Sequence, residues 1–159
     1  MFLQPNVGQD SWGVLLKALS TSIALTILTT LLGALIAFFI AVFTARNLSP
    51  NWLANTLKAV MAFIRSIPTI IWVLIYSAVM GLGANAAVVG LTFHSIAYLV
   101  KAYSESIEET PQATIEALKA SGVRFWPIIF QAILPSIVPA LLSWTFIRFE
   151  INFANAVAV

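Results

Sequence analysis

The residues best placed to do chemistry lie near the end of the chain, in an otherwise apolar stretch. Arg148 and Glu150 are charged, and Asn152 and Asn155 follow them closely. In a helix, residues three and four apart are neighbours, so Arg148 shares a face with both asparagines while Glu150 points elsewhere. A charge inside a membrane helix costs at least about 2.5–3.5 kcal/mol on insertion scales. We therefore expect Arg148 and Glu150 each to have a partner on another helix or on a second copy of the chain.

Two interpretations of this polar face stay open. In the first, Arg148 and the asparagines line a translocation path for an anion. In the second, they form a structural clasp between helices or lie near a membrane interface. The path candidates of the first interpretation are Arg148, Glu150, Asn152, Asn155, Arg65 and His94. Arg65 and His94 also have ordinary structural interpretations. A long arginine side chain can reach a membrane interface, and a lone histidine is often a packing residue.

A second pattern lies in a polar segment that is too charged to cross a membrane. Seven charges fall in it: Lys101, Glu105, Glu108, Glu109, Glu116, Lys119 and Arg124. Within this segment we predict a short amphipathic helix, with Thr110 as its N-cap, Pro111 at its first position and Gly122 just after its end. Ile115 and Leu118 give it one apolar face. The remaining carboxylates, Glu105, Glu108 and Glu109, are typical of a solvated face.

Catalytic and metal-binding arrangements are missing from the sequence. Gly8 and Gly13 have the spacing of a P-loop, but Val14 stands where that motif requires lysine. The chain has one histidine and no cysteine, and its His, Asp and Glu residues lack metal-ligand spacing. We expect neither catalytic residues nor a metal site, and any uphill process would take its energy from a partner. Basic stripes of the kind that bind nucleic acid are also missing.

The composition is that of a membrane protein. Hydrophobic residues make up 60% of the 159 residues and charged residues 9%, against about 25% charged in an ordinary soluble domain. The predicted membrane helices cover about residues 14–44, 54–80 and 86–104, with a last one from Pro127 or Pro135 towards Val159. Pro68 should kink the second of these, and neighbouring groups should then bind the carbonyl that the proline leaves free. The fold class is therefore all-α, with about four transmembrane helices.

Lysine and arginine in the short connections predict the orientation. Arg46 and Lys58 flank the first connection, and Lys101, Lys119 and Arg124 flank the third, whereas the second, residues 81–85, has none. Cations in short loops favour the cytoplasmic side. The first and third connections, including the short amphipathic helix, are therefore predicted to be cytoplasmic.

The polar segment resembles the cytoplasmic loop of type-1 (MetI-like) permeases of ATP-binding-cassette importers. Their pattern is E-A-A-x-x-x-G, nine residues, then I-x-L-P. Five of its seven positions match, while Leu118 and Ala132 replace an alanine and the isoleucine. The resemblance implies that the short helix is a coupling helix docking into an ATPase subunit. It identifies these coupling-loop residues: Glu116, Ala117, Leu118, Gly122, Leu134 and Pro135.

A narrower similarity is to the phosphonate-uptake permeases. It rests on residues 65–68 (Arg-Ser-Ile-Pro), residues 81–83 (Gly-Leu-Gly), His94 and residues 148–152 (Arg-Phe-Glu-Ile-Asn). The similarity implies import of a phosphonate or a related phosphorus oxyanion by alternating access. An amino acid or a sulfonate remains an alternative substrate, and a channel-like or assembly protein without an ATPase remains an alternative class.

The resemblance also implies the partners and the setting. The partners are an ATPase dimer, which binds the ATP so that this chain needs no cofactor, a second permease copy, and a periplasmic or lipid-anchored substrate-binding protein. The setting is the bacterial inner membrane. Family members usually have five or six membrane helices, so we expect residues 1–159 to form a single permease domain that is incomplete at both ends.

Overall fold

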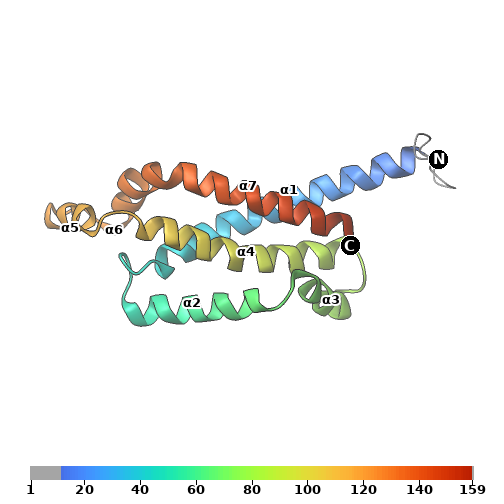
Figure 1. Cartoon of the computed structure of the whole chain (residues 1–159), viewed down its shortest axis with the longest axis horizontal. Coiled ribbons are helices and arrows are strands. Elements are labelled where there is room, and N and C mark those ends of the chain that lie inside the picture. Colours follow the sequence, from blue (N-terminus) through green and yellow to red (C-terminus); the bar gives the residue numbers. More distant parts are fainter. Residues whose placement is uncertain (1–11, 159) are drawn as a thin grey trace, which may run out of the picture.

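The computed structural model describes residues 12–158, and every regular element in that range is a helix (Figure 1). The helices are α1 (Trp12–Thr44), α2 (Asn51–Ser66), α3 (Thr69–Met80), α4 (Ala84–Glu108), α5 (Gln112–Ala120), α6 (Phe125–Pro127), the π-helix η1 (Ile128–Ile133) and α7 (Leu134–Ala158). The all-helical prediction is confirmed for these residues. Three helical stretches are long and apolar enough to cross a membrane, or up to four if a bent pair counts as one span.

α1 is the most hydrophobic of the three unbroken candidate spans and packs against α4 through its small residues. Gly33, Ala37 and Ala41 lie one turn apart and are all buried. A Cβ added at Gly33 would stand 2.9 Å from the Cβ of Ser95 on α4, so the glycine allows a close helix contact. The helix has 33 residues, and none of those after Lys17 is charged. This length exceeds the roughly 20 residues that span a bilayer core.

The second predicted helix is broken rather than kinked. α2 ends at Ser66, α3 begins at Thr69, and their axes differ by 85°. Pro68 lacks the N–H that would bind the carbonyl of Ile64, four residues back. The indole Nε1 of Trp72 donates to that carbonyl instead, at 3.0 Å. The prediction of one kinked helix over 54–80 was therefore wrong, because the chain forms two helices there. The expected replacement donor for the free carbonyl is present.

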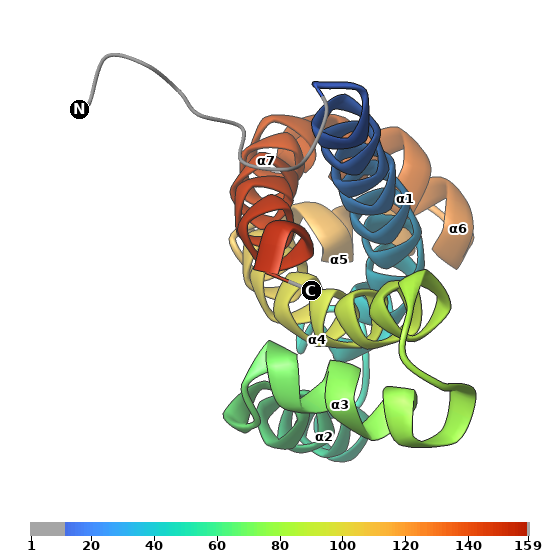
Figure 2. The ribbon, with the colours of Figure 1, turned by 90° about the vertical axis from the view of Figure 1, so that its right-hand side faces the viewer.

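α4 is the central helix, and it carries more buried residues than any other described helix. Figure 2, which looks along the bundle, shows α1 and α7 on one side of α4 and the α2–α3 pair on the other. Gly90 sits where α3 crosses: a Cβ there would lie 2.7 Å from the Cα of Val73. The helix extends past the predicted range of 86–104, so it carries Glu105 and Glu108 as helical residues.

α5 is closed by a Schellman motif at its C-terminus. The N–H of Gly122 donates to Lys119 O at 3.0 Å and that of Val123 to Leu118 O at 3.2 Å. Gly122 has a φ of +77°, which glycine adopts without strain, so the predicted end of this helix is confirmed. The predicted start is wrong. The cap position is Pro111 rather than Thr110, and the Thr110 hydroxyl is buried without a hydrogen-bond partner among the described residues.

The final helical stretch begins at Phe125 and changes its winding before α7. Over Ile128–Ile133 the backbone is π-helical, and the N–H of Leu134 donates to Ile129 O, five residues back. Regular α-helix then begins at Leu134, directly before Pro135. Of the two predicted starting points, the one at Pro127 is closer to where the helical backbone begins, and the one at Pro135 to where α7 begins.

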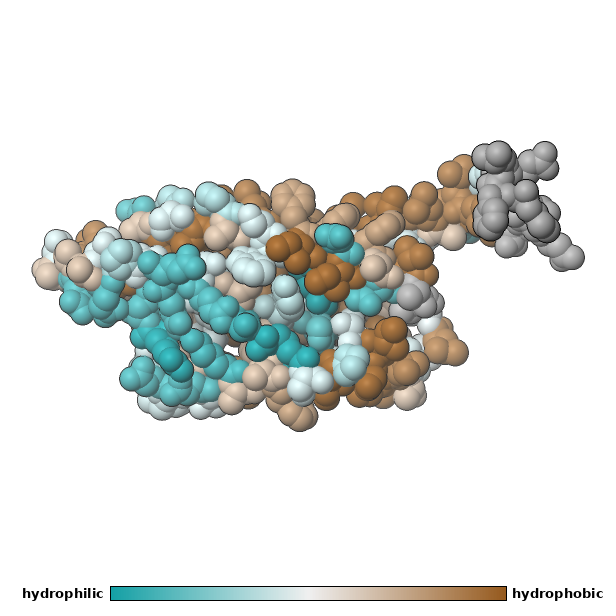
Figure 3. Space-filling model, viewed as in Figure 1, coloured by the Kyte–Doolittle hydropathy of each residue, from teal (hydrophilic) through white to brown (hydrophobic). Residues whose placement is uncertain are grey.

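Polar groups gather at one end of the bundle. The α1–α2 connection and α5 lie together at the end opposite to the C-terminal part of α7 (Figure 1). Figure 3 shows hydrophilic residues concentrated over the parts of α2, α4 and α5 at that end, and hydrophobic residues towards the other. The first and third connections therefore share one end of the molecule, as the charge distribution predicts.

Candidate functional site: a buried polar cluster and a protruding helix

Arg148 is the centre of a polar cluster inside the bundle. Its side chain is 1% exposed. Nε donates to Ser95 Oγ at 2.9 Å, and the terminal nitrogen Nη2 lies 3.0 Å from His94 Nδ1. The guanidinium carbon also lies 5.3 Å from the centre of the Tyr98 ring, within the range of a cation–π contact. The predicted partner for Arg148 on another helix therefore exists: His94, Ser95 and Tyr98 all lie on α4.

Asn152 extends the cluster to α1. It is fully buried, and its Nδ2 donates to Thr30 Oγ1 at 3.0 Å and to Ser95 Oγ at 2.9 Å. Ser95 lies opposite Gly33, whose missing side chain lets α1 approach α4 this closely. One turn of α7 thus holds α1 and α4 together through two side chains. The predicted shared face of Arg148 and Asn152 is confirmed by their common partner, Ser95.

His94 joins α3 to the same cluster. Thr69, the first residue of α3, has its hydroxyl 3.0 Å from His94 Nδ1, the atom that Arg148 also approaches. A guanidinium can only donate, so Nδ1 must be the acceptor and Thr69 must donate as well. This geometry assigns the neutral ring with its proton on Nε2. The cluster therefore ties α1, α3, α4 and α7 together with one cation and neutral partners.

The other predicted path residues lie elsewhere. Glu150 is exposed on a different face of α7 and has no ion pair within residues 12–158. Asn155 is partly buried and makes no side-chain hydrogen bond in the described range. Arg65 lines a separate cleft between α2 and α4. Only Arg148, Asn152 and His94 of the six candidates are brought together.

Sequence reasoning missed four of the neutral members of the cluster. They are Thr30, Thr69, Ser95 and Tyr98. A serine or threonine in an apolar helix usually bonds to its own backbone, as several do here, so residue type alone does not mark a member of a buried network. The adjacency of Ser95 to His94 is the only local signal.

α5 protrudes from the polar end with one face anchored. Ile115 is fully buried, and Leu118 and Val123 pack against the same core cluster. The opposite face exposes Glu116 and Ala117, with Glu116 Oε1 accepting from Gln112 Nε2 at 3.2 Å. Leu134 and Pro135 stand at the start of α7. The predicted coupling residues thus divide into exposed positions on the helix, an inward Leu118, and the start of the following helix.

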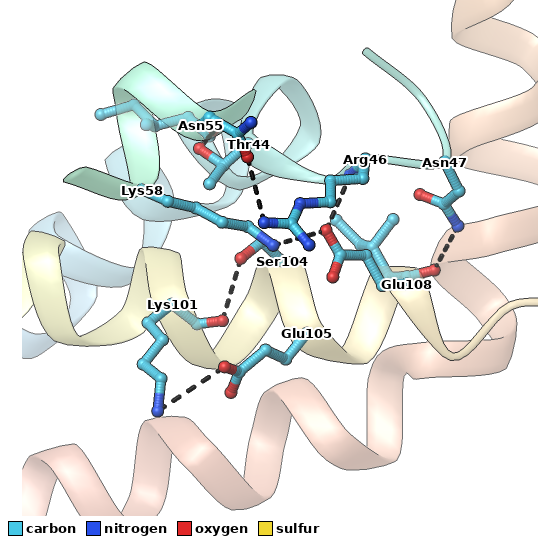
Figure 4. Close-up of polar contacts among 11 residues, drawn as sticks. Thr44, Arg46, Asn47, Asn55, Lys58, Lys101, Ser104, Glu105 and Glu108 are labelled. Atoms are coloured by element: carbon cyan, nitrogen blue, oxygen red, sulfur yellow. Dashed lines mark hydrogen bonds and ion pairs between the residues drawn. The ribbon is translucent and has the colours of Figure 1, made fainter. Parts of the chain in front are cut away.

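An ion network fixes the base from which α5 projects (Figure 4). Glu108 Oε1 accepts from Lys58 Nζ and from the backbone N–H of Arg46, both at 2.7 Å. Asn47 Nδ2 donates to Ile107 O at 2.8 Å. Glu108 is therefore a structural ion-pair partner, which corrects its assignment to a solvated face. Three segments, the α1–α2 connection, α2 and the end of α4, are held together there.

Comparisons with known proteins agree on one family. Residues 33–159 match the family model described as "Binding-protein-dependent transport system inner membrane component". A phosphate-import permease protein, PhnE, of Mycolicibacterium smegmatis is 30% identical over 116 residues, 72% of this chain and 22% of that protein. The phosphite transport system permease protein PtxC of Stutzerimonas stutzeri is 29% identical over 147 residues, 92% of this chain and 52% of that protein. The chain thus spans about half the length, or less, of these relatives.

Methionine permeases are also similar. The D-methionine transport system permease protein MetI of Escherichia coli is 30% identical over 97 residues, 57% of this chain and 45% of that protein. Among solved structures, an inward-facing MetNI methionine ABC transporter superposes with a TM-score of 0.83 and 22% identity. That match covers 93% of this chain and 74% of the other, and it shows a shared fold.

Proposed function

The chain belongs to the family of binding-protein-dependent transport system inner membrane components, and from that membership we propose that it is the membrane-spanning permease of a bacterial ATP-binding-cassette importer. The match covers residues 33–159 and includes α5 and both flanking helices. The observation that carries the proposal is the position of the coupling-loop pattern. Glu116 and Ala117 stand on the exposed face of a short helix that is anchored by Ile115 and closed by Gly122.

The proposed substrate is a phosphonate or a related phosphorus oxyanion. Two relatives carry phosphate or phosphite in their names. Arg148 supports an anion in particular, because its partners are neutral and its positive charge is therefore not cancelled within the described residues. The similarity to methionine permeases keeps an amino acid as the alternative substrate.

The proposed topology has four membrane helices. The α2–α3 pair counts as one broken span, and α5 lies in the cytoplasm between the third and fourth spans. Two copies of the permease would form the path, and two ATPase subunits would bind ATP and grip α5 of each copy. A periplasmic or lipid-anchored binding protein would deliver the substrate at the opposite face of the bacterial inner membrane.

Alternating access gives the buried cluster a role. We place Arg148, His94 and Asn152 beside the route of the anion, with Asn155 further along α7. Because Arg148 is 1% exposed, the route opens there only if α7 moves relative to α4. Glu150, on another face of α7, is proposed to face the second copy. Arg65 lies nearer to the polar end.

Two substitutions in α5 test the coupling role. Glu116→Lys reverses an exposed charge on the proposed docking face, and Gly122→Pro removes a residue whose φ of +77° proline cannot adopt. Each should lower substrate uptake at least tenfold while ATP hydrolysis by the purified complex persists, so that hydrolysis and uptake separate. Glu109→Lys, the same charge reversal on an exposed residue outside α5, should leave uptake near wild type. Unchanged uptake in both α5 variants would contradict the docking role.

A channel-like or assembly protein without an ATPase is the competing class. Purification of the chain with its membrane complex separates the two, because a permease of this family should bring an ATPase subunit with it. Binding measurements on the partner substrate-binding protein, with phosphonate, phosphite, phosphate and methionine as ligands, would then decide the substrate.

A further inference from the structure

A small cleft opens between α2 and α4 near the polar end of the bundle. Its volume is about 190 Å³. Three cations line it, Lys58 and Arg65 from α2 and Lys101 from α4, together with one carboxylate, that of Glu105. Thr44 and Ser104 add hydroxyl groups to the lining, and Figure 4 shows the Ser104 hydroxyl bonded to the backbone carbonyl of Lys101. The cleft therefore carries an excess of positive charge.

Arg65 differs from the two lysines because no carboxylate neutralises it within residues 12–158. Lys58 pairs with Glu108 at 2.7 Å, and Lys101 pairs with Glu105 at 3.6 Å. The Nε of Arg65 is buried, and it has no hydrogen-bond acceptor in the described part of the chain. The Arg65 side chain as a whole is only partly buried, so the cost falls on this one donor: a buried N–H without an acceptor is unfavourable, and the guanidinium keeps an uncancelled charge beside the cleft. A water molecule would satisfy the donor but would not neutralise the charge.

The chemistry of the cleft suits a small oxyanion with several acceptor oxygens. A guanidinium offers parallel donors that match a phosphate group, and lysine ammonium groups add point charges. A water molecule occupies about 30 Å³ in the liquid, so the cleft has room for a group of several heavy atoms. We propose that this cleft binds a phosphate-type oxyanion, with Arg65 as its principal donor and Lys58 and Lys101 as flanking charges.

The position of the cleft connects it with the buried cluster. Lys58 and Arg65 are seven residues apart on α2, and His94 and Lys101 are seven apart on α4, which is two helical turns or roughly 10 Å in each case. Thr69, four residues after Arg65, bonds to His94. Polar groups on two facing helices thus run from the Arg148 cluster to the cleft.

Two sources can supply such an oxyanion. One is the transported phosphonate or phosphate, and this version of the proposal rests on the function proposed above. The other is the phosphate of an anionic lipid headgroup, for which basic pockets between membrane helices are known sites. The second version does not depend on transport. Binding to the purified chain can be measured without the ATPase, so its outcome is independent of whether the transport proposal holds.

The experiment uses the full chain in lipid nanodiscs. In discs of phosphatidylcholine alone, methylphosphonate and inorganic phosphate are titrated by calorimetry. In discs that also contain phosphatidylglycerol, native mass spectrometry counts the lipids retained. Arg65→Gln removes the guanidinium and its charge. Arg65→Lys keeps the charge but lacks the parallel N–H donors of the guanidinium. Arg46→Gln is the control. It also replaces an arginine with glutamine at the polar end of the bundle, but Arg46 does not line the cleft.

Saturable binding of a free oxyanion identifies the substrate as the source, and selective retention of phosphatidylglycerol identifies the lipid. In either case Arg65→Gln should weaken binding at least about tenfold, since it removes a charge-assisted hydrogen bond, with a smaller loss for Arg65→Lys and none for Arg46→Gln. Gel filtration and circular dichroism verify that each variant is folded. Absence of both kinds of binding in the wild type, or equal losses in Arg65→Gln and Arg46→Gln, would overturn the proposal.

Discussion

Arg148 is a buried cation whose hydrogen-bond partners are all neutral. His94, Ser95 and the ring of Tyr98 surround it, and none of them carries a negative charge. Neutral dipoles compensate for part of the lost hydration but leave the net charge in place. A structural clasp alone could be built from neutral residues, as Asn152 and Thr30 show a few ångströms away. The charge therefore favours the path interpretation over the clasp, although the two are compatible.

Replacing Arg148 with methionine should separate these roles. His94 keeps its hydrogen bond from Thr69 and Ser95 keeps the one from Asn152, so the loss of folding free energy should stay below about 3 kcal/mol. If the proposed path role holds, uptake of the proposed oxyanion substrate should fall at least tenfold, because the uncancelled charge is gone. Thermal unfolding in detergent and uptake by cells measure the two effects. Arg46→Met, an exposed change of the same charge, is the control, and normal uptake by Arg148→Met would rule out a path role.

At the scale of single residues, the sequence predicts which face of a helix a side chain lies on, but not which residues it contacts. The four-residue spacing of Arg148 and Asn152 correctly placed both on one face, and the different position of Glu150 placed it on another. Their partners could not be inferred, because contact with Ser95, His94 and Thr30 depends on how the helices pack. That packing depends in turn on Gly33, and the sequence shows its small size without showing which residue lies opposite.

One side chain, that of Trp72, bridges the break between α2 and α3. Pro68 leaves the carbonyl of Ile64 without its helical donor, and the Trp72 indole, one turn into α3, supplies a substitute. The same ring packs edge-on against Phe93 of α4, with centroids 4.7 Å apart. Trp72 therefore bonds back to α2 while packing α3 against α4, and it fixes the place where the chain turns by 85°.

Trp72→Phe should test this element. Phenylalanine keeps an aromatic ring but has no donor, so Ile64 O loses its partner at a cost of about 1–3 kcal/mol. The apparent melting temperature of the purified chain should fall. Trp52→Phe makes the same substitution at a side chain that is 72% exposed, and it should change stability by less than about 0.5 kcal/mol. Equal melting temperatures for the two variants would show that the indole bond does not stabilise the break.

The elements differ in how far sequence could define them. The end of α1 was predicted at the observed residue, Thr44, because its uncharged run and its length leave few alternatives. Pro68 marked the position of the α2–α3 break, but the angle between the two helices depends on how closely α3 approaches α4 at Gly90. Thr110 failed as a cap because Pro111 took that position, and the π-helical turn at 128–133 carried no local signal.

At the scale of the whole molecule, the proposed mechanism requires that α5 face the ATPase side of the membrane. The structure places α5 and the α1–α2 connection, which carries Arg46, at the same end, and the α3–α4 connection, around Leu82, at the other. Lysine and arginine in short loops favour the cytoplasm, so the end with α5 should be inside. α1 is long enough to cross the apolar core with several turns to spare.

Single cysteines would test this orientation directly, because the chain contains no cysteine of its own. Leu82→Cys, at a side chain that is 90% exposed, should react with a membrane-impermeant maleimide in intact spheroplasts. Ala120→Cys, exposed on α5, should react only in inverted vesicles, and Val73→Cys, buried between α3 and α4, in neither preparation. The pattern follows from the asymmetry of cations between the two ends. Labelling of Ala120→Cys from outside would put α5 beyond the reach of any cytoplasmic ATPase, and coupling through Glu116 and Gly122 would then be impossible.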